Sequence, residues 1–418
     1  MTTTTSTTTT TSTTATTTTV PVTEALPLLS EAPHGPVRAW MVERIFRQAM
    51  RSLPVRVAFP GGERIGRGGP DSPVMRIVRP AEFFSRLAVV GPVGFGEAYM
   101  AGDWTSTDPA GLLTPVAARL TRPARRSATA FRRWADQSRP DSERNTLEGA
   151  RSNIRRHYDL SNEFFALFLD PSMTYSCALF GPGDDLHAAQ IRKIDRVLDL
   201  AGVGPGTRML EIGTGWGALA VRAGQRGAQV DTLTISPRQR DLALGQIAEA
   251  GVSDRVTVHL RDYREAEGEY DAIVSVEMLE AVGAEYWPAY FAALDRLLAP
   301  GGRVALQTIT MPHDRMLATK DVRTWIQKYV FPGGQIPSLR AVEEALAPTS
   351  LHISGRHQMG DHYARTLALW RSRFLSRDEV TAFGFAPEFP RLWEFYLAYS
   401  EAGFRSGYLD LWQLQLTR

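Results

Sequence analysis

The sequence predicts an α/β protein with a doubly wound, mostly parallel sheet, preceded by a smaller α+β module. Two observations predict the sheet. From residue 200 onward, short apolar runs alternate with helical runs, and a glycine-rich segment at residues 213–217 follows the first apolar run. The composition agrees, since 43% hydrophobic and 22% charged residues are ordinary for a globular chain. The 418 residues suffice for two or three domains.

The chain opens with a tract that cannot form a core. Residues 2–19 are Thr and Ser with one Ala, so we expect residues 1–34 to be a disordered tail. The single cysteine, Cys177, excludes a disulfide framework and a cysteine-rich metal site, and we predict no metal. No apolar run is long enough to span a membrane, and the net charge of +2 excludes a polycation.

Residues 35–118 are predicted to form a small α+β domain that handles lipid. Apolar spacing predicts a helix over residues 37–46. Alternation predicts strands over residues 55–59 and 74–78, and a proline opens a helix over residues 81–87.

A basic linker is predicted over residues 119–150. Residues 119–156 contain 11 Arg and no Lys against four acidic residues. Two interpretations remain open: a solvated connector, or a surface that meets anionic phosphates.

Strand–helix alternation fills the predicted domain at residues 151–418. A Pro-Gly-Gly turn at residues 300–302 precedes the last parallel strand. The expected strands are residues 207–212, 228–233, 255–260, 270–276 and 303–307, and the expected helices include residues 237–250 and 287–298.

The first strand-to-helix turn carries the strongest local signal. Glu211 precedes Gly213, Gly215 and Gly217 in an E-x-G-x-G-x-G pattern. Such glycines let a ligand approach the backbone next to the free N–H groups of a helix start. A dinucleotide loop has G-x-G-x-x-G spacing instead, so the pattern favours S-adenosylmethionine. The loop resembles motif I of the class I methyltransferases, which implies a Rossmann-like sheet of seven mostly parallel strands.

The second strand departs from the usual methyltransferase pattern because no acid stands at its tip. We expect Ser236 and Gln239 to hold the ribose instead. The other residues predicted to line the cofactor from these two strand ends are Thr234, Ile235, Asp262 and Tyr263.

Several longer segments identify a family. They are residues 157–165, 173–178, 233–239, 276–280 and 409–413. With them, residues 80–418 resemble the cyclopropane-fatty-acyl-phospholipid synthase and mycolic acid methyltransferase family. Residues 307–314 and 325–334 most resemble its tuberculostearic acid methyltransferases, which add a 10-methylene group, the precursor of a 10-methyl branch.

The resemblance implies an S-adenosylmethionine-dependent C-methyltransferase that acts on the cis double bond of oleoyl-type chains in membrane phospholipids. The expected product is a mid-chain methylene fatty acid, and the alternative is a cyclopropane. A flavin-dependent reductase would consume the methylene product. We further expect a homo-oligomer, no nucleic-acid partner, and a cytoplasmic enzyme peripheral on the inner face of the membrane.

The chemistry requires a base. An alkene is a poor nucleophile, so the methyl donor must be held in line with it and water kept out. Attack leaves a carbocation, and a base must then remove one proton. We expect loss from the new methyl group to close a cyclopropane and loss from a neighbouring carbon to give a methylene branch. The resemblance implies bound bicarbonate as that base, with Glu280 orienting it and relaying its proton.

The resemblance also implies the residues around the bicarbonate. They are Cys177, Glu280, Ile309 and Tyr363, with Gln307 and Ala281 where the family often has histidine. Tyr175, Ser176 and Glu277 are assigned to the cofactor, with His157 and Tyr158 in a lid over it.

Less specific interpretations stay open. Each residue of the bicarbonate site could serve structure alone, and the C-terminal aromatic residues fit either a core or an acyl tunnel. Two rivals are a non-catalytic lipid carrier and a nucleic-acid methyltransferase that uses the arginine-rich stretch.

Overall fold

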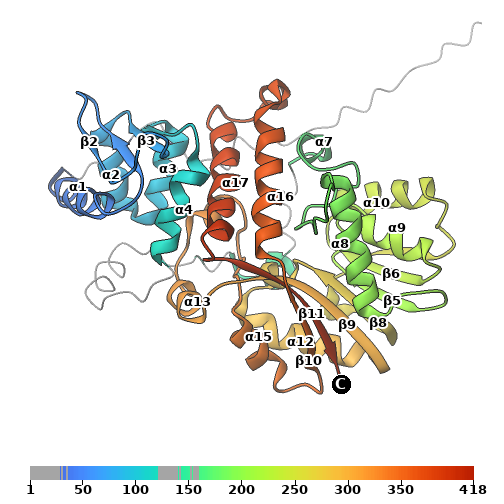
Figure 1. Ribbon diagram of the computed structural model, residues 1–418. Coiled ribbons are helices and arrows are strands. Elements are labelled where there is room, and N and C mark those ends of the chain that lie inside the picture. Colours follow the sequence, from blue (N-terminus) through green and yellow to red (C-terminus); the bar gives the residue numbers. More distant parts are fainter. Residues whose placement is uncertain are drawn as a thin grey trace, which may run out of the picture.

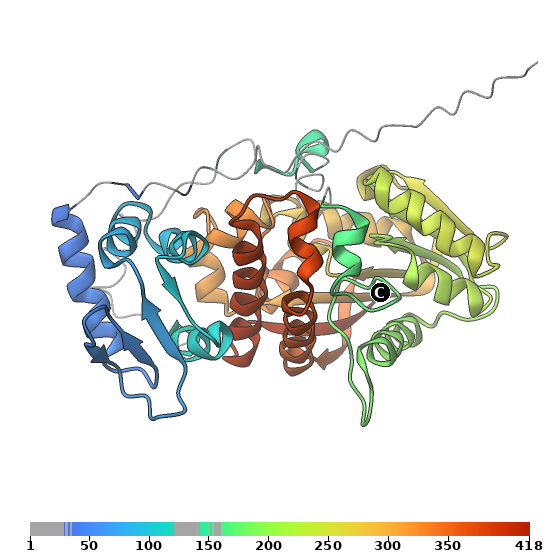
Figure 2. The same ribbon diagram turned by 90° about the horizontal axis from the view of Figure 1, so that it is seen from above.

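The computed structural model describes residues 29, 32–33, 36–120, 140, 143–150, 153 and 160–418. Three parts lie side by side in Figures 1 and 2: an N-terminal α+β part, the long pair of helices α16 (Gly360–Leu375) and α17 (Phe389–Arg405), and a large sheet with its helices. His157, Tyr158 and most of the basic linker lie outside the described residues.

The N-terminal part is a small mixed sheet covered by helices, with strand order β2-β1-β3-β4. β1 pairs with β3 in parallel, whereas β2 and β4 are antiparallel to their neighbours. The predicted strands and helices are confirmed here. Their bounds are α1 Pro36–Met50, β1 Arg56–Ala58, β2 Arg64–Ile65, β3 Val74–Ile77, α2 Pro80–Val90, α3 Pro92–Ala101, β4 Trp104–Thr105 and α4 Pro109–Leu120.

The large sheet has seven strands in the order β10-β11-β9-β8-β5-β6-β7. The five strands from β9 to β7 run parallel, and β10 and β11 are antiparallel at one edge. This confirms the predicted Rossmann-like class. The bounds are β5 Arg208–Ile212, β6 Gln229–Thr234, β7 Val256–Leu260, β8 Tyr270–Val276, β9 Leu298–Thr310, β10 His352–Gln358 and β11 Asp410–Thr417.

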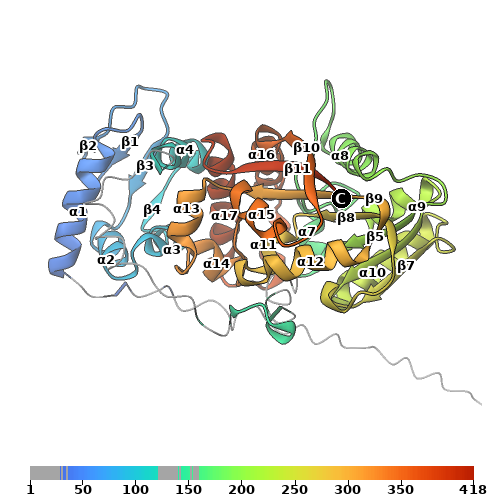
Figure 3. The ribbon, with the colours of Figure 1, turned by 90° about the horizontal axis from the view of Figure 1, so that it is seen from below.

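Alternate residues of the central strands enter two cores, as expected for a sheet that helices cover on both faces. Leu210 and Ile273 pack with α12 and α15, which lie together on one side of the sheet in Figure 3. Met209 and Val274 pack instead with α8, α9 and α10. The helices are α7 Asn162–Ala166, α8 Leu186–Ala201, α9 Ala218–Gln225, α10 Pro237–Glu249, α11 Leu279–Val282, α12 Trp287–Leu297, α13 His313–Thr319, α14 Trp325–Tyr329 and α15 Leu339–Leu346.

The expected turn at residues 300–302 differs from the structure. β9 begins at Leu298 and continues past it, because the pairing with β8 resumes at Arg303 after an irregularity. Gly301 takes a φ of 77°, which lets the extra residues bulge out of the ladder.

One hydrophobic core joins the N-terminal part to the C-terminal helices. Val57 and Phe83 belong to the same buried cluster as Phe164 and Trp393. α17 contacts both α3 and α4. Because packing continues from the N-terminal part into the C-terminal helices, the structure does not separate these parts. The predicted domain boundaries stay predictions. Most of the C-terminal aromatic residues lie in this core, including Phe389, Phe395, Tyr396 and Phe404.

The described end of the basic linker is packed against the large domain. The Asn145 side-chain amide donates to the carbonyls of Ala281 and Gly333, at 2.9 and 3.0 Å. Asn153 donates to Asn145 Oδ1 and to the Glu143 carbonyl. These residues are buried, so this end of the segment is no solvated connector.

Candidate active site

The glycine-rich loop leaves β5 and turns into α9. Gly213, Gly215 and Gly217 have φ values of 99°, 53° and 101°, a region that side chains disfavour. A Cβ on Gly213 would lie 2.6 Å from Met278 Cγ, and one on Gly217 would lie 3.1 Å from Ala243 Cβ. A Cβ on Gly215 would meet no protein atom within 4 Å. Gly215 thus borders open space in which a ligand can reach the backbone.

A tryptophan that sequence reasoning did not single out fixes this loop. The Trp216 ring is buried, and its Nε1–H donates to Asn162 Oδ1 at 2.8 Å. Its ring also contacts Phe165, with 5.0 Å between centroids. The loop is therefore held by α7, a contact between segments about fifty residues apart that no local motif signals.

Glu211 anchors the loop to the next strand. Its Oε2 accepts from the Thr232 hydroxyl at 2.6 Å. The Thr232 hydroxyl in turn accepts from the Thr214 hydroxyl at 2.7 Å, so the three side chains form one series of hydrogen bonds. Burial raises the pKa of Glu211 to about 8.

At the tip of β6 the predicted ribose ligands shape the turn. Ser236 caps α10, since its Oγ accepts from the Gln239 N–H, and Thr234 Oγ1 donates to Gln239 Oε1 at 2.9 Å. Ile235 lies between them and is partly buried. A ribose contact by these residues stays a prediction.

Asp262 and Tyr263 follow β7. Both Asp262 oxygens accept from the Arg264 guanidinium at 2.8 Å, and Oδ1 also caps the short helix Tyr263–Glu265. The buried Tyr263 hydroxyl has no hydrogen-bond partner among the described residues. Its ring packs on Tyr290 at 5.2 Å.

A buried lysine on α8, Lys193, lies behind the predicted cofactor residues Tyr175 and Ser176. Lys193 Nζ donates to Ser176 Oγ at 2.8 Å, and Gln190 donates to the Ser176 carbonyl. Tyr175 OH lies 2.8 Å from Tyr396 OH. Burial lowers the pKa of Lys193, while the nearby Glu277 carboxylate opposes that shift. The sequence gives no signal for the burial of Lys193, because lysine side chains are ordinarily exposed.

Glu277 is the centre at which the predicted catalytic residues meet. Its Oε1 accepts from the Cys177 N–H at 2.9 Å and from Gln307 Nε2 at 2.8 Å, and its Oε2 accepts from Tyr363 OH at 2.6 Å. Gln413 Nε2 donates to Gln307 Oε1 at 2.9 Å, which fixes the amide so that its NH₂ faces Glu277.

The Glu277 backbone is strained. Its φ of 53° is left-handed, which costs a non-glycine residue of order 1–3 kcal/mol and persists where the surroundings enforce it. The three donors supply that enforcement.

Glu280 forms a second, adjacent carboxyl site. Its Oε1 accepts from the Thr308 hydroxyl at 3.1 Å and from the Ile309 N–H. Its Oε2 is buried and has no partner among the described residues. Burial and repulsion from Glu277 raise the pKa of Glu280 to about 8, so it is mainly protonated at neutral pH.

The structure places a carboxylate of the chain among the residues expected to hold bicarbonate. Cys177, Gln307 and Tyr363 do converge, and Ile309 joins Glu280, but the three converging donors hold a carboxylate of the chain itself. A bicarbonate would have to displace Glu277 or lie as a second anion against it. The Glu277 carboxylate already occupies these donors, and a bicarbonate bound to them stays a prediction.

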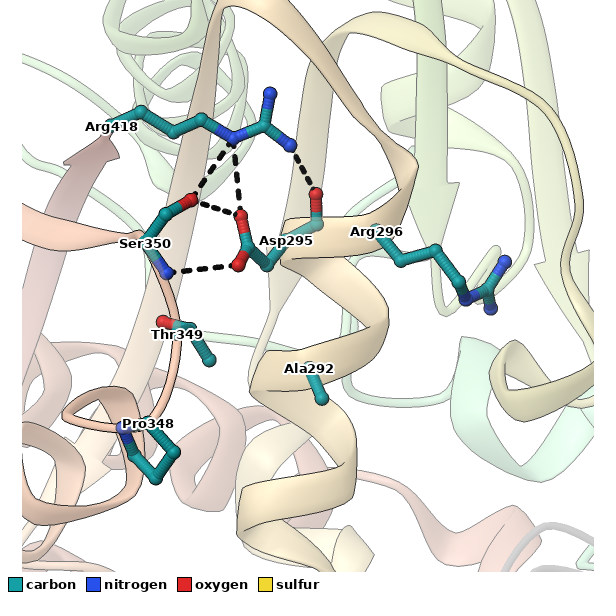
Figure 4. Close-up of a pocket in the computed structure, with 7 residues that line it drawn as sticks. All are labelled: Ala292, Asp295, Arg296, Pro348, Thr349, Ser350 and Arg418. Atoms are coloured by element: carbon teal, nitrogen blue, oxygen red, sulfur yellow. Dashed lines mark hydrogen bonds and ion pairs between the residues drawn. The ribbon is translucent and has the colours of Figure 1, made fainter.

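A surface pocket elsewhere does not compete with this site. It lies between α12 and the chain end, and its polar groups pair with each other: Asp295 accepts from the Ser350 N–H at 2.9 Å and from Arg418 Nε at 3.1 Å (Figure 4). None of its seven lining residues belongs to the predicted site. Among the described residues, no cluster of His, Cys, Asp or Glu is suited to a metal ion.

Comparison with known proteins agrees with the geometry. The family model described as mycolic acid cyclopropane synthetase matches residues 145–414. The chain is 47% identical to the tuberculostearic acid methyltransferase UfaA1 of Mycobacterium tuberculosis over 94% of this chain and 95% of that protein. It is 32% identical to the cyclopropane-fatty-acyl-phospholipid synthase of Escherichia coli over 82% of this chain and 87% of that protein.

Solved structures give the same result. The cyclopropane synthase MmaA2 of M. tuberculosis superposes with a TM-score of 0.60 at 34% identity, covering 64% of this chain and 98% of that one. The mycolic acid cyclopropane synthase CmaA1, solved with S-adenosylhomocysteine, superposes with the same TM-score at 32% identity and the same coverage. The chain belongs to the mycolic acid cyclopropane synthetase family and is an S-adenosylmethionine-dependent methyltransferase.

Proposed function

We propose that this enzyme transfers a methyl group to the double bond of an oleoyl-type chain in a membrane phospholipid and converts that chain, still esterified in the lipid, to a mid-chain methylene fatty acyl chain. One observation carries the choice of product. The similarity to a tuberculostearic acid methyltransferase extends over nearly both whole chains at 47% identity, against 32% for a cyclopropane synthase. A methylene chain is the unsaturated precursor of a methyl branch, so a reductase would have to act next.

The residues have separable tasks. S-adenosylmethionine supplies the methyl group, and the loop at Gly213–Gly217 offers it an open backbone surface beside Gly215. Trp216 and Glu211 keep that loop in place through their bonds to α7 and β6. The apolar and aromatic surroundings of Tyr175 exclude water from the developing positive charge.

The product follows from the position of the charge when the proton leaves, and not, as expected from the sequence, from which carbon loses the proton, because loss from a neighbouring chain carbon would leave a double bond within the chain. When one alkene carbon bonds to the methyl group, its neighbour becomes positive. A hydride shift to that neighbour moves the charge to the methylated carbon, and proton loss from the methyl group then gives the methylene. Proton loss from the methyl group before any shift closes a cyclopropane instead.

An exposed face of α1 supports action at a membrane surface. Trp40, Met41 and Ile45 are 61%, 50% and 49% exposed, and the Arg44 guanidinium lies 5.9 Å from the Trp40 ring. The opposite face packs into the core through Val42. Apolar and aromatic residues beside arginine fit the boundary between headgroups and acyl chains. We propose from this face of α1 that the enzyme associates peripherally with the inner leaflet. No helix of the described residues has the length and apolarity to cross a bilayer.

The test uses purified enzyme, S-adenosylmethionine and vesicles of dioleoyl phospholipid with an anionic fraction. The fatty acids are cleaved chemically from the recovered lipid, and their proton NMR spectrum distinguishes methylene protons from cyclopropane ring protons. We expect methylene signals. Cyclopropane signals alone would establish the alternative product, and unmodified chains would contradict lipid methylation.

A further inference from the structure

The position of the Glu277 carboxylate carries an inference about the proton-transfer step. Three donors from three elements surround it: the Cys177 N–H, the amide of Gln307 on β9 and the hydroxyl of Tyr363 on α16. A carboxylate and a bicarbonate present the same pair of acceptor oxygens, so this donor set suits either. Here the chain itself supplies the anion, as the Glu277 carboxylate.

Glu277 keeps this place despite an unfavourable backbone. Among the described residues, only Met173 and Glu277 have a positive φ without being glycine. Glycine would adopt this conformation without strain. Strain of this kind gathers at functional sites, where the surrounding structure enforces it.

The charges around Glu277 suit a proton acceptor. Its donors stabilise a carboxylate, the buried Lys193 is attractive, and the adjacent Glu280 is mainly protonated. Burial raises the pKa of Glu277 above the usual value, which matches it better to accepting a proton near neutral pH.

We propose that Glu277 is the catalytic base of this enzyme and replaces a bound bicarbonate. The assignment rests on the proposed function. The C–H bond of the transferred methyl group breaks, its electron pair forms the new C=C bond, and the proton moves to a Glu277 oxygen. Glu277 returns the proton to water after product release. Tyr363 and Gln307 position the carboxylate.

The first test is bicarbonate dependence. Turnover on oleoyl vesicles is measured in buffer freed of carbon dioxide and in the same buffer with added bicarbonate. We expect equal rates for the wild-type enzyme, and no heat when bicarbonate is titrated into it. A wild-type rate that collapses without bicarbonate and returns with it would overturn the assignment.

Variants at Glu277 give the second test. Glu277→Gln keeps the shape but cannot accept the proton, so turnover should fall about 100-fold or more while S-adenosylmethionine affinity stays within a few-fold. Glu249→Gln, on the exposed side of α10, is the matched control and should keep wild-type turnover. Full turnover of Glu277→Gln would overturn the assignment.

Glu277→Gly covers the case in which glutamine disturbs folding, because glycine tolerates this φ and opens the space that the carboxylate fills. We expect this variant to lose turnover in bicarbonate-free buffer and to regain part of it with bicarbonate. Full turnover of this variant without bicarbonate would refute the base. If the wild-type enzyme made no lipid product in either buffer, the proposed function would fall first and the base with it.

Discussion

Substituting Gly215 by alanine separates the cofactor site from the stability of the fold. The added Cβ meets no protein atom within 4 Å, so the protein itself should lose only the cost of a left-handed alanine at φ 53°. That cost is about 1–2 kcal/mol of unfolding free energy. The methyl group would instead stand in the space where we place S-adenosylmethionine, and we expect its affinity to fall roughly tenfold or more, equivalent to about 1.4 kcal/mol.

Gly217→Ala is the matched control from the same loop. Its φ is 101° and its Cβ would lie 3.1 Å from Ala243 Cβ, so overpacking adds typically 1–3 kcal/mol to the backbone cost. Urea denaturation and calorimetric titration measure the two quantities. We expect Gly217→Ala to be the less stable variant and Gly215→Ala to be mainly a binding variant. Normal S-adenosylmethionine affinity in Gly215→Ala would refute the placement of the cofactor.

Three further outcomes follow from the structure. Trp216→Phe removes the hydrogen bond to Asn162 and should lower the unfolding free energy by about 1 kcal/mol and weaken cofactor binding in calorimetry; unchanged binding would show that this bond does not hold the loop. The pKa of Glu280 is raised from its usual 4.5 to about 8 in the folded state. The stabilisation from this carboxyl group is therefore full below pH 4.5 and is lost as the pH rises toward 8. Glu280→Gln should flatten this part of the profile of unfolding free energy against pH, and an unaltered profile would contradict the burial argument. Trp40→Ser should weaken vesicle sedimentation, whereas Leu244→Ser, also exposed, should leave it unchanged; equal binding by both would exclude α1 as the lipid contact.

The strands of the large sheet were predictable because their signal is local. β8 matches its expected residues throughout, β5 and β7 begin one residue later than expected, and β6 is shifted by one residue at both ends. β9 was expected to begin after the glycine turn, but pairing with β8 extends it back to Leu298. Periodicity identifies a strand, whereas its ends depend on neighbours that are distant in the sequence.

The site was predictable only in part, for the same reason. The motifs brought Cys177, Gln307 and Tyr363 to one place, yet they did not show that Glu277 would reach the three donors. Glu277 lies three residues before Glu280, and only its left-handed backbone conformation shows which of the two carboxylates reaches the donors. Lys193 gave no signal, because a single lysine on a helix is ordinarily exposed.

The fate of the transferred methyl group tests the proposed reaction most directly. S-adenosylmethionine with a trideuterated methyl group, supplied with oleoyl phospholipid, measures this by mass spectrometry of the fatty acid product. We expect a product that keeps two of the three deuterium atoms, because the base takes the third. A product that keeps all three would show that the proton leaves another carbon, and it would contradict the proposed route.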